Sequence, residues 1–291
     1  MTPNVVSTAD LIGGWLADLE SGEPPEKYAL PSPFGPVDLR PGMVAVFAGQ
    51  PGAGKTAAML QITVELLRMN PAARALIANV EMAPVRLLER IVSRLSGVPL
   101  TCLRDRTLTD DQTRRVHVGV NTLRQVGDRL TFLREPYTLE HVALSADQVQ
   151  AKVLIVDYVQ RFTLTGEKAD ERAGLNANMD MLRTFGHGGA LVLAVSALAR
   201  GNSPNGSTYA NPGMASLRGS SELEYGADAV YILQPAADGP GVTLANPKQR
   251  DGAPADVALT FDGAVQAFSP AEDFDALAAF DVTAPAKRRG A

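Results

Sequence analysis

One run of eight residues constrains the fold of this chain more than any other segment. It reads Gly49-Gln50-Pro51-Gly52-Ala53-Gly54-Lys55-Thr56 and lies between an apolar run, Met43 to Ala48, and a helical pattern, Ala57 to Met69. This is the GxxxxGK(S/T) phosphate-binding loop in the strand–loop–helix context that the motif requires. Its glycines let backbone N–H groups approach phosphate oxygens, and the following helix adds the positive end of its dipole. The run is therefore predicted to bind a nucleoside triphosphate.

Two residues of this loop have predicted chemical roles. Lys55 would contact the β- and γ-phosphates as a point charge, and the Thr56 hydroxyl would bind Mg²⁺. The sequence thus predicts ATP and Mg²⁺ as cofactors. The alternative is a chance glycine-rich turn, and the match along the whole motif in its expected context argues against it.

Composition limits the remaining possibilities. The 291 residues suffice for one large α/β domain or two small ones. The single cysteine, Cys102, excludes an internal disulfide framework and a four-cysteine zinc site. Without a long apolar run or a secretory pattern at the N-terminus, we expect a cytoplasmic protein that does not enter a membrane. The net charge of −5 argues mildly against nucleic-acid binding, although net charge does not describe local surfaces.

Strand and helix patterns alternate through the middle of the chain. Strands are predicted at Met43–Ala48, Ala75–Val80, Leu130–Leu133, Val153–Val156 and Leu191–Ser196. Helices are predicted between them at Val85–Leu95, Asp111–Val126, Leu139–Gln150 and Asn176–Phe185. Such alternation is typical of a mostly parallel sheet with helices on both faces. Strands alone follow, at Val230–Leu233, Val242–Pro247 and Val257–Phe261, and they predict antiparallel hairpins at one edge.

The domain organisation is predicted in three parts. Residues 1–40 form an arm with an amphipathic helix, Thr8 to Leu19, and a proline-rich linker. Its apolar face, which includes Trp15, must be buried on its own domain or on a neighbouring subunit. Residues 41–268 form the ATPase domain, and residues 269–291 form a disordered tail.

Two carboxylates follow predicted strands. Asp157 ends the run Val153–Val156, and a carboxylate at this end of a parallel strand points into the ligand crevice. We therefore expect Asp157 to hold Mg²⁺, directly or through water. Glu81 ends the run Ala75–Val80 and is predicted to lie next to the strand of the phosphate-binding loop, where it would deprotonate the attacking water. The alternatives are a loop aspartate and a surface glutamate before a helix that starts at Pro84.

Four further blocks of sequence follow one another in a recognisable order. They are Asn79-Val80-Glu81-Met82, Ile155-Val156-Asp157-Tyr158-Val159-Gln160, Leu217-Arg218-Gly219-Ser220 with Glu224 and Ala227-Asp228, and Lys248-Gln249-Arg250-Asp251-Gly252. In this order they resemble the motor of DnaB-type replicative helicases, of the RecA-like ATPase superfamily. The first block is similar to that family's Ser-Leu-Glu-Met, whose glutamate is the catalytic base, and the last to its Lys-Gln-Arg-Asn-Gly. The resemblance, over roughly residues 38–268, implies a RecA-like P-loop ATPase core.

The resemblance gives Lys248 and Arg250 a catalytic role. They lie where a predicted strand runs into the Asp251-Gly252 turn, so that the hairpin can project from the subunit. In the family these two residues reach the γ-phosphate held by the adjacent subunit, and an arginine supplied in trans accelerates hydrolysis. The resemblance therefore implies a ring of identical subunits, expected to be a hexamer. The alternative is a pair of solvated cations.

Two features depart from the family pattern. Ser196-Ala197-Leu198-Ala199-Arg200 is similar to the family's Ser-Gln-Leu-Asn-Arg, so the glutamine that senses the γ-phosphate is Ala197 here. The resemblance thus leaves open whether hydrolysis is coupled to DNA movement. We also expect the family's N-terminal helical collar to be missing, which favours a phage, plasmid or accessory protein of bacteria. A loader or primase-type protein is a candidate partner.

Two loops are candidate contacts for single-stranded DNA, because the corresponding loops of the family line its central channel. They cover residues 161–174 and 201–216. Arg161, Arg200 and Arg218 could contact phosphates, and Tyr209 could stack on a base. The alternative is a pair of mobile surface loops.

Three functions remain at this point. The leading one is an oligomeric, ATP-hydrolysing DnaB-like helicase or translocase on single-stranded DNA. The second is a RecA-like recombination or repair ATPase that does not unwind DNA. The third is an ATP-gated assembly or signalling ATPase with little DNA affinity, for which the acidic balance and Ala197 argue.

Overall fold

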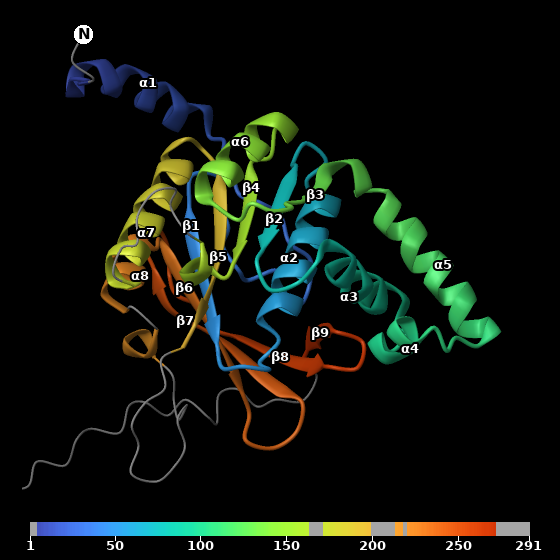
Figure 1. Cartoon of the computed structure of the whole chain (residues 1–291). Coiled ribbons are helices and arrows are strands. Elements are labelled where there is room, and N and C mark those ends of the chain that lie inside the picture. The colour runs from blue at the N-terminus through green and yellow to red at the C-terminus, as the bar shows by residue number, and fades with distance from the viewer. Residues whose placement is uncertain (1–4, 163–170, 199–212, 218–219, 272–291) are drawn as a thin grey trace, which may run out of the picture.

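The computed structural model describes residues 5–162, 171–198, 213–217 and 220–271. A nine-stranded sheet runs through the centre of this part, in the order β3-β2-β4-β5-β1-β6-β7-β8-β9 (Figure 1). Strands β1 to β6 pair in parallel, and their bounds are Val44–Gly49, Ala75–Asn79, Leu130–Phe132, Val153–Asp157, Leu191–Ala197 and Ala229–Pro235. Strands β7 (Gly241–Gln249), β8 (Val257–Asp262) and β9 (Ala267–Pro270) continue it as antiparallel hairpins.

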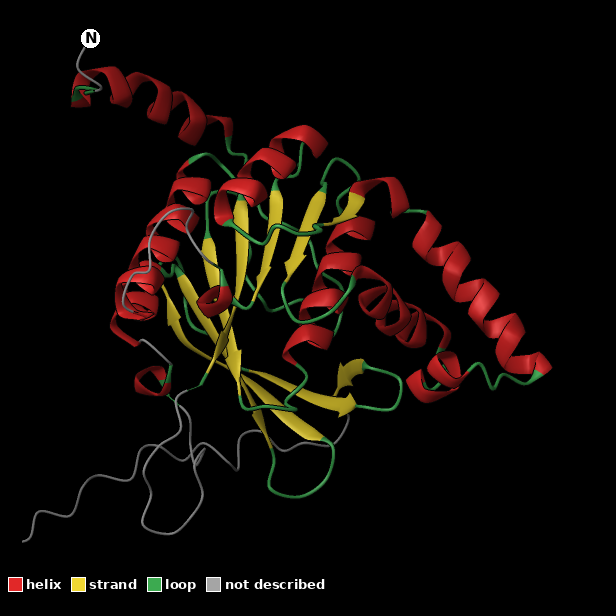
Figure 2. Ribbon diagram, in the orientation of Figure 1, coloured by secondary structure: helices red, strands yellow, loops and turns green. Residues whose placement is uncertain are grey.

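Helices cover both faces of the sheet (Figure 2). The helices after the arm are α2 (Lys55–Met69), α3 (Pro84–Ser96), α4 (Leu100–Asp105), α5 (Asp110–Arg124), α6 (Leu139–Val149), α7 (Glu171–His187) and α8 (Ser220–Gly226), with short turns η1 (Gly127–Arg129), η2 (Val159–Arg161) and η3 (Met214–Ser216). Side chains of a strand alternate between faces, so Ala45 and Phe47 of β1 pack toward α2 and α3 while Val44 and Val46 pack toward α6 and α7. Burial on both faces explains why the parallel strands are continuous apolar runs.

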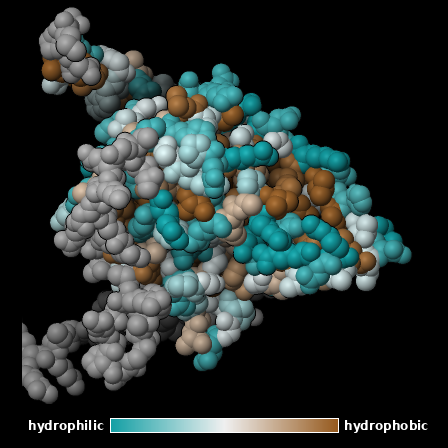
Figure 3. Space-filling model, viewed as in Figure 1, coloured by the Kyte–Doolittle hydropathy of each residue, from teal (hydrophilic) through white to brown (hydrophobic). Residues whose placement is uncertain are grey.

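The arm contains one helix that the sheet does not cover. Helix α1 (Thr8–Ser21) begins at a capping box between Ser7 and Asp10 and has no buried residue. It extends away from the sheet with apolar side chains on its surface (Figures 1 and 3), and its Trp15 is 63% exposed. The chain joins the core at the buried Tyr28. No described helix has the length and apolar content that crossing a bilayer requires.

The predicted architecture is confirmed, but one predicted neighbour is wrong. The parallel sheet, the helices on its two faces and the C-terminal hairpins are all present, and the strands shift by at most two residues from their predicted bounds. Glu81, however, does not follow a strand next to the phosphate-binding loop, because β4 and β5 lie between β2 and β1. After β2 the chain forms β3 on the outer side of β2, and it then returns to form β4 and β5 between β2 and β1.

Apart from the short turns η1, η2 and η3, three elements were not predicted from the sequence patterns: helices α4 and α8 and strand β9. Strand β9 takes up the first residues of the segment that was expected to be a tail, and it pairs with β8. The rest of that segment, residues 272–291, lies outside the described residues.

Candidate active site

The phosphate-binding loop connects β1 to α2 at the carboxyl edge of the sheet, where the parallel strands end. Gly52 and Gly54 adopt the positive φ angles 83° and 84°, which favour glycine. A Cβ atom on Gly54 would also lie 2.8 Å from the Phe268 ring of β9. Gly54 is the N-cap of α2, so the helix starts directly after it and directs free N–H groups into the loop. The loop is thus shaped for an anion.

Lys55 is held above this loop by the loop's own backbone. Its ammonium donates to the carbonyl oxygens of Gly49 at 2.8 Å and Gln50 at 3.0 Å. Burial lowers the pKa of Lys55, while the nearby carboxylates of Asp157 and Glu81 act in the opposite direction. Phosphate oxygens are charged acceptors and bind an ammonium more strongly than carbonyls do, so Lys55 can exchange one set of partners for the other.

Thr56 and Asp157, both predicted to hold the metal, lie together. The Thr56 hydroxyl donates to Asp157 Oδ2 at 2.7 Å, and the Asn79 amide donates to the same oxygen at 2.7 Å. Burial raises the pKa of the Asp157 carboxyl to about 6, although these hydrogen bonds and Lys55 lower it. The two side chains suit Mg²⁺, which binds few protein carboxylates and takes its other ligands from phosphates and water. The described residues contain no cluster of three or more His, Cys, Asp or Glu that would hold a metal ion alone.

Glu81 reaches the same pocket from β2. The backbone N–H groups of Glu81 and Met82 donate to Asn79 Oδ1 at 3.0 Å and 2.7 Å, which fixes the turn after the strand. Glu81 itself is exposed to the pocket. A carboxylate that is accessible and anchored through its backbone can approach a water molecule.

One pocket of about 570 Å³ gathers these residues. It is lined by Pro51, Gly52, Gly54, Lys55, Thr56, Ala57, Glu81, Met82, Arg90, Asp157, Tyr158, Ala197, Phe261 and Gln266. Ala197 lies beside the loop because it pairs with Gly49 in the sheet. Arg90 of α3, Phe261 and Gln266 were missed by sequence reasoning, because no motif marks them. Arg90 hydrogen-bonds to Gln266, and burial lowers the pKa of its guanidinium.

Lys248 and Arg250 lie at the opposite, amino edge of the sheet, where the parallel strands begin. Gln249 pairs with Ala229 at the start of β6, whereas Gly49 of the phosphate-binding loop pairs with Leu233 near its end. The Lys248 ammonium donates to the Glu224 carbonyl near the end of α8. The structure therefore does not bring these two cations into the pocket of their own chain.

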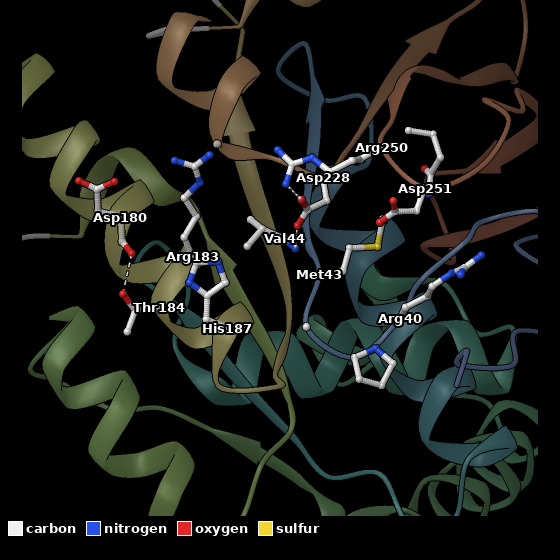
Figure 4. Close-up of a pocket in the computed structure, with 14 residues that line it drawn as sticks. Arg40, Met43, Val44, Asp180, Arg183, Thr184, His187, Asp228, Arg250 and Asp251 are labelled. Carbon is white, nitrogen blue, oxygen red and sulfur yellow. Dashed lines mark hydrogen bonds and ion pairs between the residues drawn. The ribbon is translucent and has the colours of Figure 1, made fainter. Parts of the chain in front are cut away.

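Arg250 forms an ion pair with Asp228 at this amino edge (Figure 4). The Asp228 carboxylate also accepts the N–H of Val44 at 2.8 Å, so it is anchored to the start of β1. Arg250 and Asp228 line a second pocket of about 670 Å³, and Arg183 and His187 of α7 lie on its other side (Figure 4). The pocket combines cations with carboxylates, and Arg250 lies at its exposed rim.

Of the four candidate DNA contacts, the structure describes only Arg161. This residue ends η2, soon after β4, and its guanidinium donates to the Tyr158 hydroxyl at 2.7 Å. It also lies 5.8 Å from the centre of the Tyr158 ring. Arg161 is exposed, and Tyr158, to which it donates, lines the pocket that contains Lys55 and Glu81. Arg200, Tyr209 and Arg218 lie outside the described residues.

Comparison with known proteins gives consistent matches. The family model described as DnaB-like helicase C terminal domain matches residues 37–270. A probable plasmid replicative DNA helicase of Chlamydia muridarum (strain MoPn / Nigg) is 25% identical over 243 residues, which cover 80% of this chain and 52% of that protein. The chain thus spans about half the length of this relative.

Two solved structures share the fold. A structure described as an ATPase domain matches with a TM-score of 0.79 and 16% identity, over 92% of this chain and 100% of that one. A DnaB-like replicative helicase, described with its interactions with primase, matches with a TM-score of 0.79 and 16% identity, over 91% of this chain and 69% of that one. These likenesses confirm the predicted RecA-like core.

Proposed function

The chain belongs to the family of DnaB-like helicase C-terminal domains, and from this premise we propose that it is the ATP-hydrolysing motor of an oligomeric DnaB-like helicase on single-stranded DNA. One observation carries the proposal. A single pocket gathers Lys55 and Thr56 of the phosphate-binding loop with Asp157 and Glu81. These are the groups that phosphoryl transfer to water needs for charge compensation, metal binding and positioning of the nucleophile.

Each residue of the pocket has a part in the proposed reaction. Lys55 would release the carbonyls of Gly49 and Gln50 and bind phosphate oxygens. Thr56 and Asp157 would hold Mg²⁺, which neutralises phosphate charge when bound. Glu81 would orient the attacking water and accept its proton.

The proposed site is completed by a second copy of the chain. Lys248 and Arg250 are at the amino edge, away from the pocket of their own chain, which supports a role on a neighbour's nucleotide. Stacking subunits so that one amino edge faces the next carboxyl edge gives a head-to-tail interface, and such interfaces close into rings when the rotation between subunits allows it. We propose a homo-oligomeric ring, with a hexamer as the expected size.

Single-stranded DNA is the proposed substrate. Arg161 lies after the strand that carries Asp157, so a loop there would link DNA contacts to the nucleotide pocket. Arg200, Tyr209 and Arg218 remain proposed contacts. A primase-type or loader protein is a proposed partner, since one structurally similar helicase is described with its interactions with primase. The plasmid helicase relative supports a plasmid- or phage-encoded protein acting in the bacterial cytoplasm.

A second candidate function follows from Ala197. This methyl group lines the pocket where the family has the glutamine that senses the γ-phosphate. An ATPase that uses nucleotide to control its assembly, without coupling to DNA, would tolerate this change.

The decisive experiment is steady-state ATP hydrolysis with and without single-stranded DNA, on protein whose mass in solution is recorded in the same buffer. A DNA-coupled motor is expected to hydrolyse ATP severalfold faster when DNA is added. An assembled oligomer whose rate does not respond to DNA would overturn the helicase proposal in favour of ATP-gated assembly.

A further inference from the structure

We propose that Asn79 is a positioning residue that joins the metal-holding carboxylate of Asp157 and the turn that carries Glu81 into one rigid unit. The inference rests on the proposed ATP hydrolysis, in which Asn79 itself contacts neither the phosphates nor the attacking water. Its basis is a set of three hydrogen bonds from one buried amide.

The position of Asn79 follows from the sheet register. It is the last residue of β2 and pairs with Asp157, the last residue of β4, on the neighbouring parallel strand. Paired residues on adjacent strands project from the same face, so their side chains meet. The ladder continues one residue further, where Val80 N–H donates to the Asp157 carbonyl at 2.9 Å. Asn79 is 3% exposed, so water does not compete for these contacts.

The polarity of the amide matches its two partners. Asn79 Nδ2 donates to Asp157 Oδ2 at 2.7 Å, and Asn79 Oδ1 accepts from the N–H groups of Glu81 and Met82. An ionised carboxylate only accepts, and a backbone N–H only donates, so the linking side chain needs both a donor and an acceptor, which the asparagine amide supplies on separate atoms. A serine, which the resemblance places here in the family, offers one oxygen for both tasks.

The link matters because of the strand order. Glu81 follows β2, which is separated from the strand of the phosphate-binding loop by β4 and β5. Thr56 donates to Asp157, Asp157 accepts from Asn79, and Asn79 holds the turn of Glu81. This chain of side-chain contacts runs from the phosphate-binding loop to the general base. A general base misplaced by about 1 Å can cost a hundredfold in rate, so fixing this turn affects catalysis rather than binding.

The test compares Asn79→Leu, which keeps the branched shape of the side chain and removes both polar atoms, with Asn70→Leu. Asn70 is a matched control because its amide also bridges two backbone segments, at Ala29 and Leu66, at the other end of α2. For Asn79→Leu we expect kcat for ATP to fall about tenfold to a hundredfold, while the dissociation constant of a fluorescent ADP analogue changes less than about threefold. Half-saturating Mg²⁺ is expected to rise, since Asp157 loses a donor. Asn70→Leu is expected to change none of these beyond the effect of its lower Tm.

Two further variants keep the test valid if Asn79→Leu does not fold. Asn79→Asp has the same shape and keeps the acceptor for Glu81, but sets a carboxylate against Asp157. Asn79→Ser keeps one hydroxyl. We expect Asn79→Asp to lose more kcat than Asn79→Ser at equal Mg²⁺. If Asn79→Asp turned over ATP at the wild-type rate, the inference would be overturned.

Glu81→Gln separates the positioning role of Asn79 from the proposed function. If the wild-type protein hydrolyses ATP, Glu81→Gln does not, and Asn79→Leu matches Asn70→Leu in kcat, the positioning role is wrong and the proposed function stands. If the wild-type protein binds Mg·ATP without hydrolysing it, the proposed function and the inference fall together.

Discussion

The two edges of the sheet differ in how firmly they hold their charged side chains. At the carboxyl edge, Thr56 and Asn79 donate to Asp157 at 2.7 Å, and Asp157 is 4% exposed. At the amino edge, the side chain of Arg250 is 49% exposed, and its ion pair with Asp228 faces solvent. Buried hydrogen bonds fix geometry, whereas an exposed ion pair contributes about 0–1 kcal/mol.

This difference corresponds to two different tasks. A phosphate pocket works through groups that are already oriented when the reaction begins, because they then need no reorganisation. A cation that serves a neighbouring subunit must instead leave its present contact, and breaking a weak ion pair with Asp228 requires little free energy. The carboxyl edge therefore suits a fixed site, and the amino edge suits a side chain that changes partners.

The largest expected effect on nucleotide binding comes from a change at the carboxyl edge. Lys55→Ala removes the ammonium that the loop holds with two carbonyls, and we expect nucleotide affinity to fall about a hundredfold or more, because charged hydrogen bonds to phosphate are lost. Titration with a fluorescent ATP analogue measures this affinity. Lys27→Ala is the control, since Lys27 is paired with Asp38 outside the pocket. An affinity within about threefold of wild type would show that the loop is not the nucleotide site.

Much of this edge could be predicted from the sequence because its parts are local. The phosphate-binding loop, the buried strand before Asp157 and the strand before Glu81 are each contained in a short run. The order of strands is not local. The sequence predicted Glu81 beside the loop's strand, but β4 and β5, which come later in the chain, insert between them.

The missed residues depend on contacts between distant segments. Asn79 acquires its place only when β2 pairs with β4, and Arg90 only when the turn before β9 brings Gln266 against α3. Strand β9 reads Ala-Phe-Ser-Pro, which is neither a continuous apolar run nor an alternating pattern, so no local signal indicates a strand there. The positions of Lys248 and Arg250 at the opposite edge follow from the antiparallel pairing of β7 with β6, which no short run of sequence specifies.

A smaller effect on binding, but a large one on rate, is expected when the amino edge is changed. Arg250→Ala leaves the pocket of its own chain intact, so nucleotide affinity is expected to stay within about threefold of wild type while hydrolysis falls about a thousandfold. A sharper measurement is the ATP hydrolysis rate of a mixture of the Arg250→Ala and Lys55→Ala proteins. A Lys55→Ala subunit still offers Arg250 to a neighbour whose own pocket is intact, so two inactive proteins should regain part of the hydrolysis rate when co-assembled.

The mixing experiment has a matched control at the amino-edge pocket that Arg250 lines. Arg40 also lines the amino edge but forms its ion pair with Asp38, so Arg40→Ala tests for a general loss of positive charge. Masses of all assemblies must be equal to that of wild type. A mixture that stays inactive although both variants assemble would indicate that Arg250 does not act in trans.

The smallest expected effect concerns Asp228, which holds Arg250 in the single chain. Asp228→Asn removes the charge and keeps an oxygen that can accept the Val44 N–H. Because the ion pair is exposed, its loss is expected to lower the free energy of detaching Arg250 by at most about 1 kcal/mol. This corresponds to roughly a fivefold change in an equilibrium constant. We expect half-maximal hydrolysis at a protein concentration lower by up to that factor, with Asp251→Asn as the control. A rise in the required concentration, at unchanged Tm, would mean that Asp228 orients Arg250 for the neighbour rather than restraining it.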